Sequence, residues 1–216
     1  MTEHEIRQQV VDTVVGWLGL KSSDQSHKPI IDLYNSYIPH PRGYEMTLKA
    51  DWCAATVSAV AIQLGHTDIM PVECSCSEMV KLYQKLGRWV EDDAYTPRIG
   101  DVIFYSWKDN GAGDNILAPN HVGIVTDMKG SSITVTEGNM GAGIVGMRTL
   151  QINGRYIRGF GIPDYASTAD KPQSAPWYAK DWARAAEMGL VDGTRPEDPV
   201  TRAEVATIVL RAIDAR

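Results

Sequence analysis

The architecture of this chain follows from one segment, Ala50-Asp51-Trp52-Cys53-Ala54-Ala55-Thr56-Val57-Ser58-Ala59-Val60-Ala61-Ile62-Gln63-Leu64-Gly65, which predicts a helix with a cysteine in its first turn. Alanine, leucine and glutamine favour the helix, and Gly65 stands where a C-terminal cap belongs. A thiol at a helix N-terminus feels the positive end of the macrodipole, which favours the nucleophilic thiolate. Cys53 is therefore a candidate nucleophile, and the alternative is a small residue packed among alanines.

The composition is that of a globular protein. The chain has 216 residues with 44% apolar and 22% charged residues, which suits one domain of ordinary size and a small extra piece. The net charge is −6 and no basic cluster appears, so we expect no nucleic-acid partner. No apolar run approaches a membrane span, and the N-terminus has no basic and apolar leader, so we expect no membrane partner and no secretion signal.

Three cysteines, Cys53, Cys74 and Cys76, lack the spacing of a metal site. We therefore predict no metal and no cofactor, and we interpret Cys74 and Cys76 as packing residues, kept reduced in a cytosol. The loop 108–120 is rich in glycine, aspartate and asparagine, but its acidic spacing fits no EF-hand template. A structural calcium ion in this loop is left open.

Hydrophobic periodicity outlines the remaining elements. Apolar residues three and four apart predict an amphipathic helix that closes near Gly19. Ser26 is expected to cap a second short helix. The other predicted elements are a helix over about 77–86 and strands at 102–107, 144–150 and 155–161.

Two further strands, 121–127 and 131–139, are rich in β-branched residues and form a hairpin signal. If residues 128–130 form the loop, His121 lies opposite Glu137, with the two Cβ atoms roughly 5 Å apart. The carboxylate can then hold one imidazole nitrogen and leave the other for a thiol. A two-residue loop would turn the two side chains to opposite faces. The alternative is a structural histidine beside an ordinary strand-end acid.

Four motifs, in this order, resemble the CHAP domain (cysteine, histidine-dependent amidohydrolase/peptidase). The resemblance covers about residues 25–163. It implies an α+β, papain-like (CHAP/NlpC-type) fold with helices packed on an antiparallel sheet. The motifs are Asp51-Trp52-Cys53-Ala54-Ala55, Gly100-Asp101-Val102-Ile103, Asn120-His121-Val122-Gly123-Ile124-Val125 and Thr136-Glu137-Gly138-Asn139.

The resemblance also implies roles in cleaving peptidoglycan. Cys53 is the nucleophile that forms a thioester acyl-enzyme, and His121 is the base that later protonates the leaving amine. Glu137 orients the imidazole, and Asn139 supports the same site. The backbone N–H of Cys53 is one oxyanion donor, which a helix N-terminus also offers on physical grounds. The bond cut is either the N-acetylmuramoyl-L-alanine amide or a peptide bond, and both alternatives stay open.

The predicted domains are a catalytic domain at 1–163, a linker at 164–176 and a helical hairpin at 177–216. The hairpin resembles one S-layer homology (SLH) unit, which implies binding of a secondary cell-wall polymer through Arg202, with Trp182 as a second candidate. A hairpin that only docks or oligomerises is the alternative. The likeness lies in Trp182-Ala183-Arg184-Ala185-Ala186, Gly189-Leu190-Val191-Asp192-Gly193 and Pro199-Val200-Thr201-Arg202-Ala203-Glu204.

These features favour a peptidoglycan hydrolase of the phage or prophage endolysin type, active on Gram-positive walls. We expect it to be made in the bacterial host cytoplasm and to reach the wall after holin-dependent release. One alternative is a papain-like amidase or acyltransferase acting on a soluble peptide conjugate. The other is a catalytically idle wall-binding protein.

Overall fold

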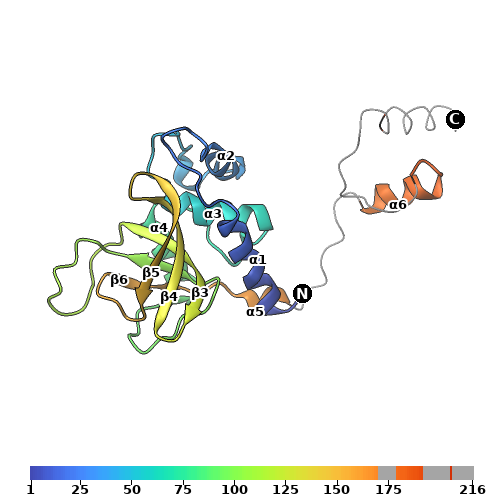
Figure 1. Cartoon of the computed structure of the whole chain (residues 1–216). Coiled ribbons are helices and arrows are strands. Elements are labelled where there is room, and N and C mark those ends of the chain that lie inside the picture. Colours follow the sequence, from blue (N-terminus) through green and yellow to red (C-terminus); the bar gives the residue numbers. More distant parts are fainter. Residues whose placement is uncertain (170–178, 192–204, 206–216) are drawn as a thin grey trace. The chain divides into compact units, whose positions relative to one another are not determined.

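The computed structural model describes residues 1–169, 179–191 and 205, and the chain divides into two units, Met1–Asp170 and Lys171–Arg216. The first unit is α+β (Figure 1). Its helices are α1 (Glu3–Val15), α2 (Lys28–Ser36), the 3-10 turn η1 (Pro41–Gly43), α3 (Cys53–Leu64), α4 (Cys76–Lys85) and α5 (Tyr165–Ala169). Its strands are β1 (Trp89–Val90), β2 (Val102–Tyr105), β3 (His121–Lys129), β4 (Ser132–Met140), β5 (Ile144–Gln151) and β6 (Ile157–Gly161).

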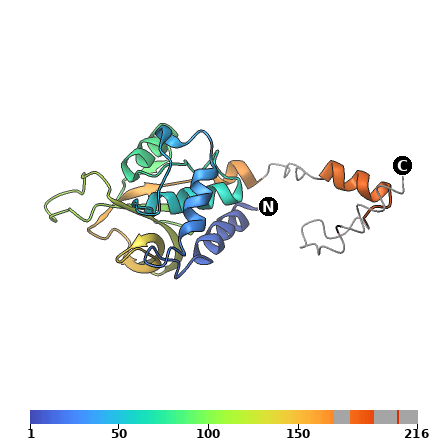
Figure 2. The same ribbon diagram turned by 90° about the horizontal axis from the view of Figure 1, so that it is seen from above.

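The six strands form one antiparallel sheet in the order β1-β6-β2-β3-β4-β5. Alternation along β2 shows its two faces. Val102 and Phe104 pack in the core that the sheet shares with α1, α3 and α4, whereas Ile103 and Tyr105 belong to a second cluster on the other face. The helices gather on one side of the sheet (Figure 2). The predicted α+β class, with helices packed on an antiparallel sheet, is confirmed.

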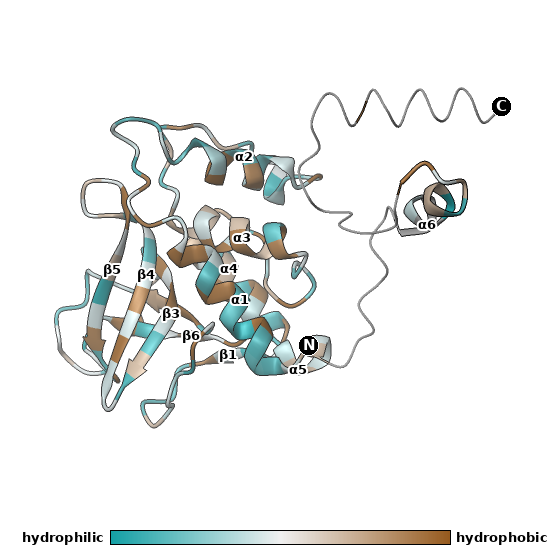
Figure 3. Ribbon diagram, turned by 45° about the vertical axis from the view of Figure 1, so that its right-hand side comes forward, coloured by the Kyte–Doolittle hydropathy of each residue, from teal (hydrophilic) through white to brown (hydrophobic). Residues whose placement is uncertain are grey.

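Helix α3 lies at the centre of this unit. Every residue from Cys53 to Ala61 is buried, and Figure 3 shows apolar colours along most of the helix. A Cβ built on Gly138 of β4 would lie 1.9 Å from Oγ1 of Thr56, so only glycine lets the strand approach the helix this closely. Gly65 closes α3 in the left-handed conformation, as predicted, with φ 69°.

The hairpin of β3 and β4 differs from the predicted one. Lys129 pairs with Ser132, so the loop has two residues instead of the expected three at 128–130. A two-residue loop alone would separate His121 and Glu137 onto opposite faces. A β-bulge at Thr126 shifts the register by one residue and returns the two side chains to the same face. The Thr126 hydroxyl supports the bulge by donating to the Thr134 carbonyl at 3.3 Å.

Two predicted boundaries are corrected. Ser26 does not cap α2, since His27 is the N-cap residue and the Ser26 hydroxyl accepts the Lys21 N–H instead. The predicted linker begins too early, because residues 165–169 form α5. Tyr165 is buried there and donates its hydroxyl to the Gly100 carbonyl at 2.7 Å, which anchors α5 to the first unit.

In the second unit the structure describes α6 (Ala179–Glu187), which carries the half-buried Trp182. The helix ends at Glu187, with Gly189 at φ 67°, and not at Gly193 as predicted. Arg202 and, apart from Val205, the second predicted helix lie outside the described residues. Among the helices that the structure describes, none has the length and apolar character needed to cross a bilayer.

Candidate active site

Cys53 is the first residue of α3, and backbone N–H groups in the first turn of this helix are available to bind other groups. Trp52 is the N-cap residue and makes no side-chain capping bond, so the N-cap side chain does not occupy the first N–H groups of the helix. The backbone N–H of Ala54 is one of the groups that bind the Cys53 sulfur. Cys53 is 6% exposed, so it lies at the edge of the core rather than on an open surface.

His121 opens β3 and faces Glu137 on the neighbouring strand. The imidazole Nε2 and the Glu137 Oε2 are 3.0 Å apart, which leaves Nδ1 as the nitrogen for a thiol. Ile124 pairs with Thr136, so Gly123 comes next to Glu137, two residues from His121. A Cβ on Gly123 would lie 2.7 Å from the Glu137 Cγ. The carboxylate therefore reaches the imidazole diagonally, across the space that Gly123 leaves empty.

The Glu137 carboxylate is fully buried and is held by a cation as well as by the imidazole. Arg148 on β5 donates two hydrogen bonds to it, from Nε to Oε1 at 2.8 Å and from Nη2 to Oε2 at 3.0 Å. The Arg148 guanidinium also lies 4.6 Å from the Trp107 ring centroid. Although burial opposes ionisation, the bonds from His121 and Arg148 lower the pKa of Glu137. Sequence analysis missed Arg148, although a buried carboxylate calls for a charged partner.

The thiol and the imidazole act on each other. The pKa of Cys53 is lowered to about 5, first by a hydrogen bond from Cys76 and, against the cost of burial, by the hydrogen bond and charge of His121. Burial would lower the pKa of His121, but its hydrogen bonds with Cys53 and Glu137 outweigh burial and raise it to about 9. Both shifts favour a thiolate and an imidazolium at neutral pH.

The structure pairs His121 with Glu137, and the charge of His121 acts on Cys53, whereas the side chain of Asn139 has a different partner. The Asn139 side-chain amide donates to Oδ1 of Asp51 at 3.0 Å. Its backbone is left-handed, with φ 55°, at an irregularity of β4. Asn139 therefore ties β4 to the segment that leads into α3, and its described hydrogen bond does not involve the imidazole.

Cys76 was predicted to be a packing residue, but it also contacts the candidate nucleophile. Its sulfur lies 3.7 Å from that of Cys53, although the two residues are 23 positions apart. No spacing rule signals such a pair, because it depends on how α4 packs against α3.

Comparison with protein families gives a match to part of the chain. Residues 43–139 match the family model of the CHAP domain. The matched stretch contains Cys53, His121, Glu137 and Asn139, and ends before Arg148. The CHAP domain is papain-like, in agreement with the α+β architecture, and CHAP domains are typically cysteine- and histidine-dependent hydrolases. A CHAP domain implies peptidoglycan as substrate and peptidoglycan hydrolase activity in general.

Two other comparisons gave no relatives. No curated protein matches the chain, and no solved structure matches it. The CHAP domain match does not reach residues 177–216, so the SLH-like unit with Trp182 and Arg202 stays a prediction.

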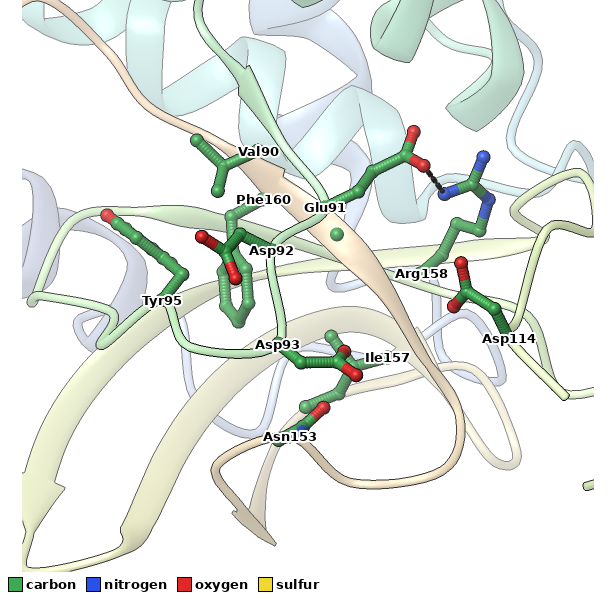
Figure 4. Close-up of a pocket in the computed structure, with 11 residues that line it drawn as sticks. Val90, Glu91, Asp92, Asp93, Tyr95, Asp114, Asn153, Ile157, Arg158 and Phe160 are labelled. Carbon is green, nitrogen blue, oxygen red and sulfur yellow. Dashed lines mark ion pairs between the residues drawn. The ribbon is translucent and has the colours of Figure 1, made fainter.

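A small pocket that none of the three candidate catalytic residues lines is acidic. Asp92, Asp93 and Asp114 line it, and Glu91 beside them is paired with Arg158 at 2.9 Å (Figure 4). In residues 1–169, 179–191 and 205, no group of three or more His, Cys, Asp or Glu side chains is arranged to hold a metal ion. In the loop for which calcium was left open, the Asp109 carboxylate accepts a bond from the Arg155 Nε at 3.0 Å.

A Gly123→Ala substitution is expected to reduce turnover by about 100-fold. The added methyl group would displace Glu137, and a misplacement of catalytic groups by about 1 Å lowers the rate by about this factor. The new methyl group would lie 2.6 Å from the Val135 Cγ1 and 2.7 Å from the Glu137 Cγ. Since β3 is paired on both sides, its backbone cannot move away. Steady-state kinetics on soluble wall peptides measures the loss. Gly16→Ala, at the end of α1, is the control, and equal rates for the two variants would contradict the diagonal contact.

The pH dependence of kcat/KM is expected to be bell-shaped. Below pH about 5 the Cys53 thiolate takes up a proton, and above pH about 9 the His121 imidazolium loses the proton that the leaving amine needs. The two limbs belong to the coupled pair and not to either residue alone. This profile is tested by initial rates on a soluble peptide substrate, measured from about pH 4 to about pH 10. Activity that rises only above the pKa of a free thiol would contradict the ion pair.

Proposed function

We propose that this protein hydrolyses an amide bond of Gram-positive peptidoglycan through a Cys53-His121-Glu137 mechanism. The observation that carries the proposal is the contact between the His121 imidazole and the buried Glu137 carboxylate, together with a Cys53 thiol whose pKa His121 helps to lower. The CHAP domain match over residues 43–139 supports peptidoglycan as the substrate class.

Acylation begins when the Cys53 thiolate attacks the amide carbonyl carbon. The carbonyl oxygen becomes an oxyanion, and the N–H groups at the start of α3 supply donors and a favourable dipole for it. The C–N bond then breaks, and the His121 imidazolium gives its proton to the departing amine. The product of this step is a thioester on Cys53.

Deacylation uses the same groups in reverse. The now neutral His121 takes a proton from water, the resulting hydroxide attacks the thioester carbonyl, and the C–S bond breaks. A free carboxyl group leaves, and the thiolate and imidazolium are restored. Glu137 holds the imidazole and stabilises its cationic form in both half-reactions, while Arg148 holds Glu137 ionised.

Mass spectrometry of muropeptides from digested Gram-positive peptidoglycan tests the proposal. We expect new amine and carboxyl ends with intact glycosidic bonds, and the mass of the fragments tells a muramoyl-L-alanine amidase from an endopeptidase. Cleavage confined to the glycan would contradict the proposal. Hydrolysis of soluble peptide conjugates with untouched walls would favour the soluble-substrate alternative instead.

Delivery to the wall is a separate proposal. An endolysin role with holin-dependent release rests on the predicted function alone. The C-terminal unit would contribute by contacting a secondary cell-wall polymer through Trp182 and Arg202. Binding of the full chain to polymer-stripped and intact walls, with Arg202→Ala for comparison, tests this second step.

A further inference from the structure

A second thiol lies beside the candidate nucleophile, and the mechanism above leaves it unused. The sulfur atoms of Cys53 and Cys76 are 3.7 Å apart, which is within hydrogen-bonding distance for sulfur. Each cysteine is the first residue of its helix, Cys53 of α3 and Cys76 of α4. Two helix N-termini therefore direct their positive ends toward the same pair of sulfur atoms.

The segment that carries Cys76 is held rigidly. The buried Glu73 carboxylate accepts the backbone N–H groups of Cys74 at 2.7 Å and Ser75 at 3.0 Å. Arg42 binds the same carboxylate through two nitrogens, at 2.8 Å and 3.0 Å. Cys76 follows directly, is 8% exposed, and has little freedom to turn its sulfur away from Cys53.

The surrounding charges decide which sulfur ionises. The positive charge of His121 raises the stability of a thiolate at Cys53, and the thiolate in turn raises the pKa of His121. Asp51 carries a negative charge that opposes a thiolate at Cys76. The hydrogen bond to Cys53, burial and the Asp51 charge together raise the pKa of Cys76 well above its ordinary range. The proton therefore stays on Cys76, and its S–H can donate to the Cys53 thiolate.

We propose that Cys76 is a positioning residue whose S–H donates a hydrogen bond to the Cys53 thiolate and holds that sulfur ready for attack. The inference rests on the proposed function for its role in turnover, but the hydrogen bond itself does not require any substrate. A thiolate that accepts a donor from Cys76 in addition to its interaction with His121 keeps one orientation. It also stays ionised at a lower pH than the ion pair alone allows.

The test follows the alkylation rate of Cys53 by iodoacetamide against pH, with peptide mass spectrometry to locate the label and a phosphine reductant present. In Cys76→Ala and Cys76→Val, which lack a donor, the apparent pKa of Cys53 should rise by about one pH unit, about tenfold in the ionisation equilibrium. Cys76→Ser keeps a donor and should stay within about half a pH unit of the wild-type value. Cys74→Ala is the matched control and should leave the profile unchanged.

Two outcomes would overturn the proposal. One is an unchanged Cys53 profile in either donor-lacking variant that melts like the wild type. The other is an equal shift in Cys76→Ser and Cys76→Val, which would assign the effect to packing. Because alkylation needs no wall substrate, the alkylation result can be interpreted even if the protein does not hydrolyse peptidoglycan. If hydrolysis is present, the acidic limb of kcat/KM should move with the alkylation profile.

Discussion

Cys53→Ala protein is expected to leave purified Gram-positive walls turbid under conditions in which the wild type clears them. Removing the nucleophile removes the thioester step itself, so the loss should approach the about 10⁶-fold seen when the serine of a hydrolase triad is deleted. Alanine suits the first turn of α3, and the substitution removes only the sulfur atom of Cys53. The fold should therefore survive.

The control for this variant is Cys74→Ala. Cys74 is a half-buried cysteine whose sulfur contacts Arg42 and not the imidazole. Clearing by Cys53→Ala at the wild-type rate would contradict Cys53 as the nucleophile, provided that both variants show the same thermal unfolding as the parent. The idle wall-binding alternative instead predicts that the wild type binds walls but does not clear them.

Glu137→Gln is expected to lower kcat/KM by about 1,000-fold, which is less than for Asp-to-Asn changes in serine triads because the thiolate already exists. The amide keeps the shape of the side chain but loses the charge that stabilises the imidazolium. His121 should then lose its proton at a lower pH, so the alkaline limb of the activity profile should move down from about 9. Rates and pH profiles on a soluble peptide substrate measure both effects.

A matched glutamate separates this effect from a general loss of charge. Glu91 is also paired with an arginine, Arg158, but lies in the acidic pocket that His121 does not line. Glu91→Gln should retain wild-type activity. If Glu137→Gln kept full activity with an unchanged alkaline limb, Glu137 would be a structural acid rather than the partner of the imidazole.

The sequence was most informative where a local pattern carries the structure. Alanine-rich helix α3, its glycine cap and the β-branched strands β3 and β4 follow from propensity and periodicity, and they were predicted. The α5 helix was missed because 164–176 has the composition of a linker. Its order comes from burial of Tyr165 against the first unit, which is a tertiary contact.

The candidate site shows the same division. Cys53, His121 and Glu137 could be singled out from their motifs, but the reason that two of them meet was predicted wrongly. A two-residue loop and the bulge at Thr126 replace the expected three-residue loop. Because Gly123 has no side chain, the Glu137 carboxylate can extend past it to the His121 imidazole. Arg148 and Cys76 escaped prediction because strand and helix packing bring them in from distant positions.

Trapping the acyl-enzyme tests the central claim most directly. Protein mixed with soluble peptidoglycan fragments is quenched in acid during turnover, and mass spectrometry of the intact chain and its peptides locates any adduct. The account predicts an acyl fragment on Cys53 that hydroxylamine removes and that Cys53→Ala lacks. Rapid amide cleavage with Cys53 unmodified, or with the acyl group on another residue, would contradict it.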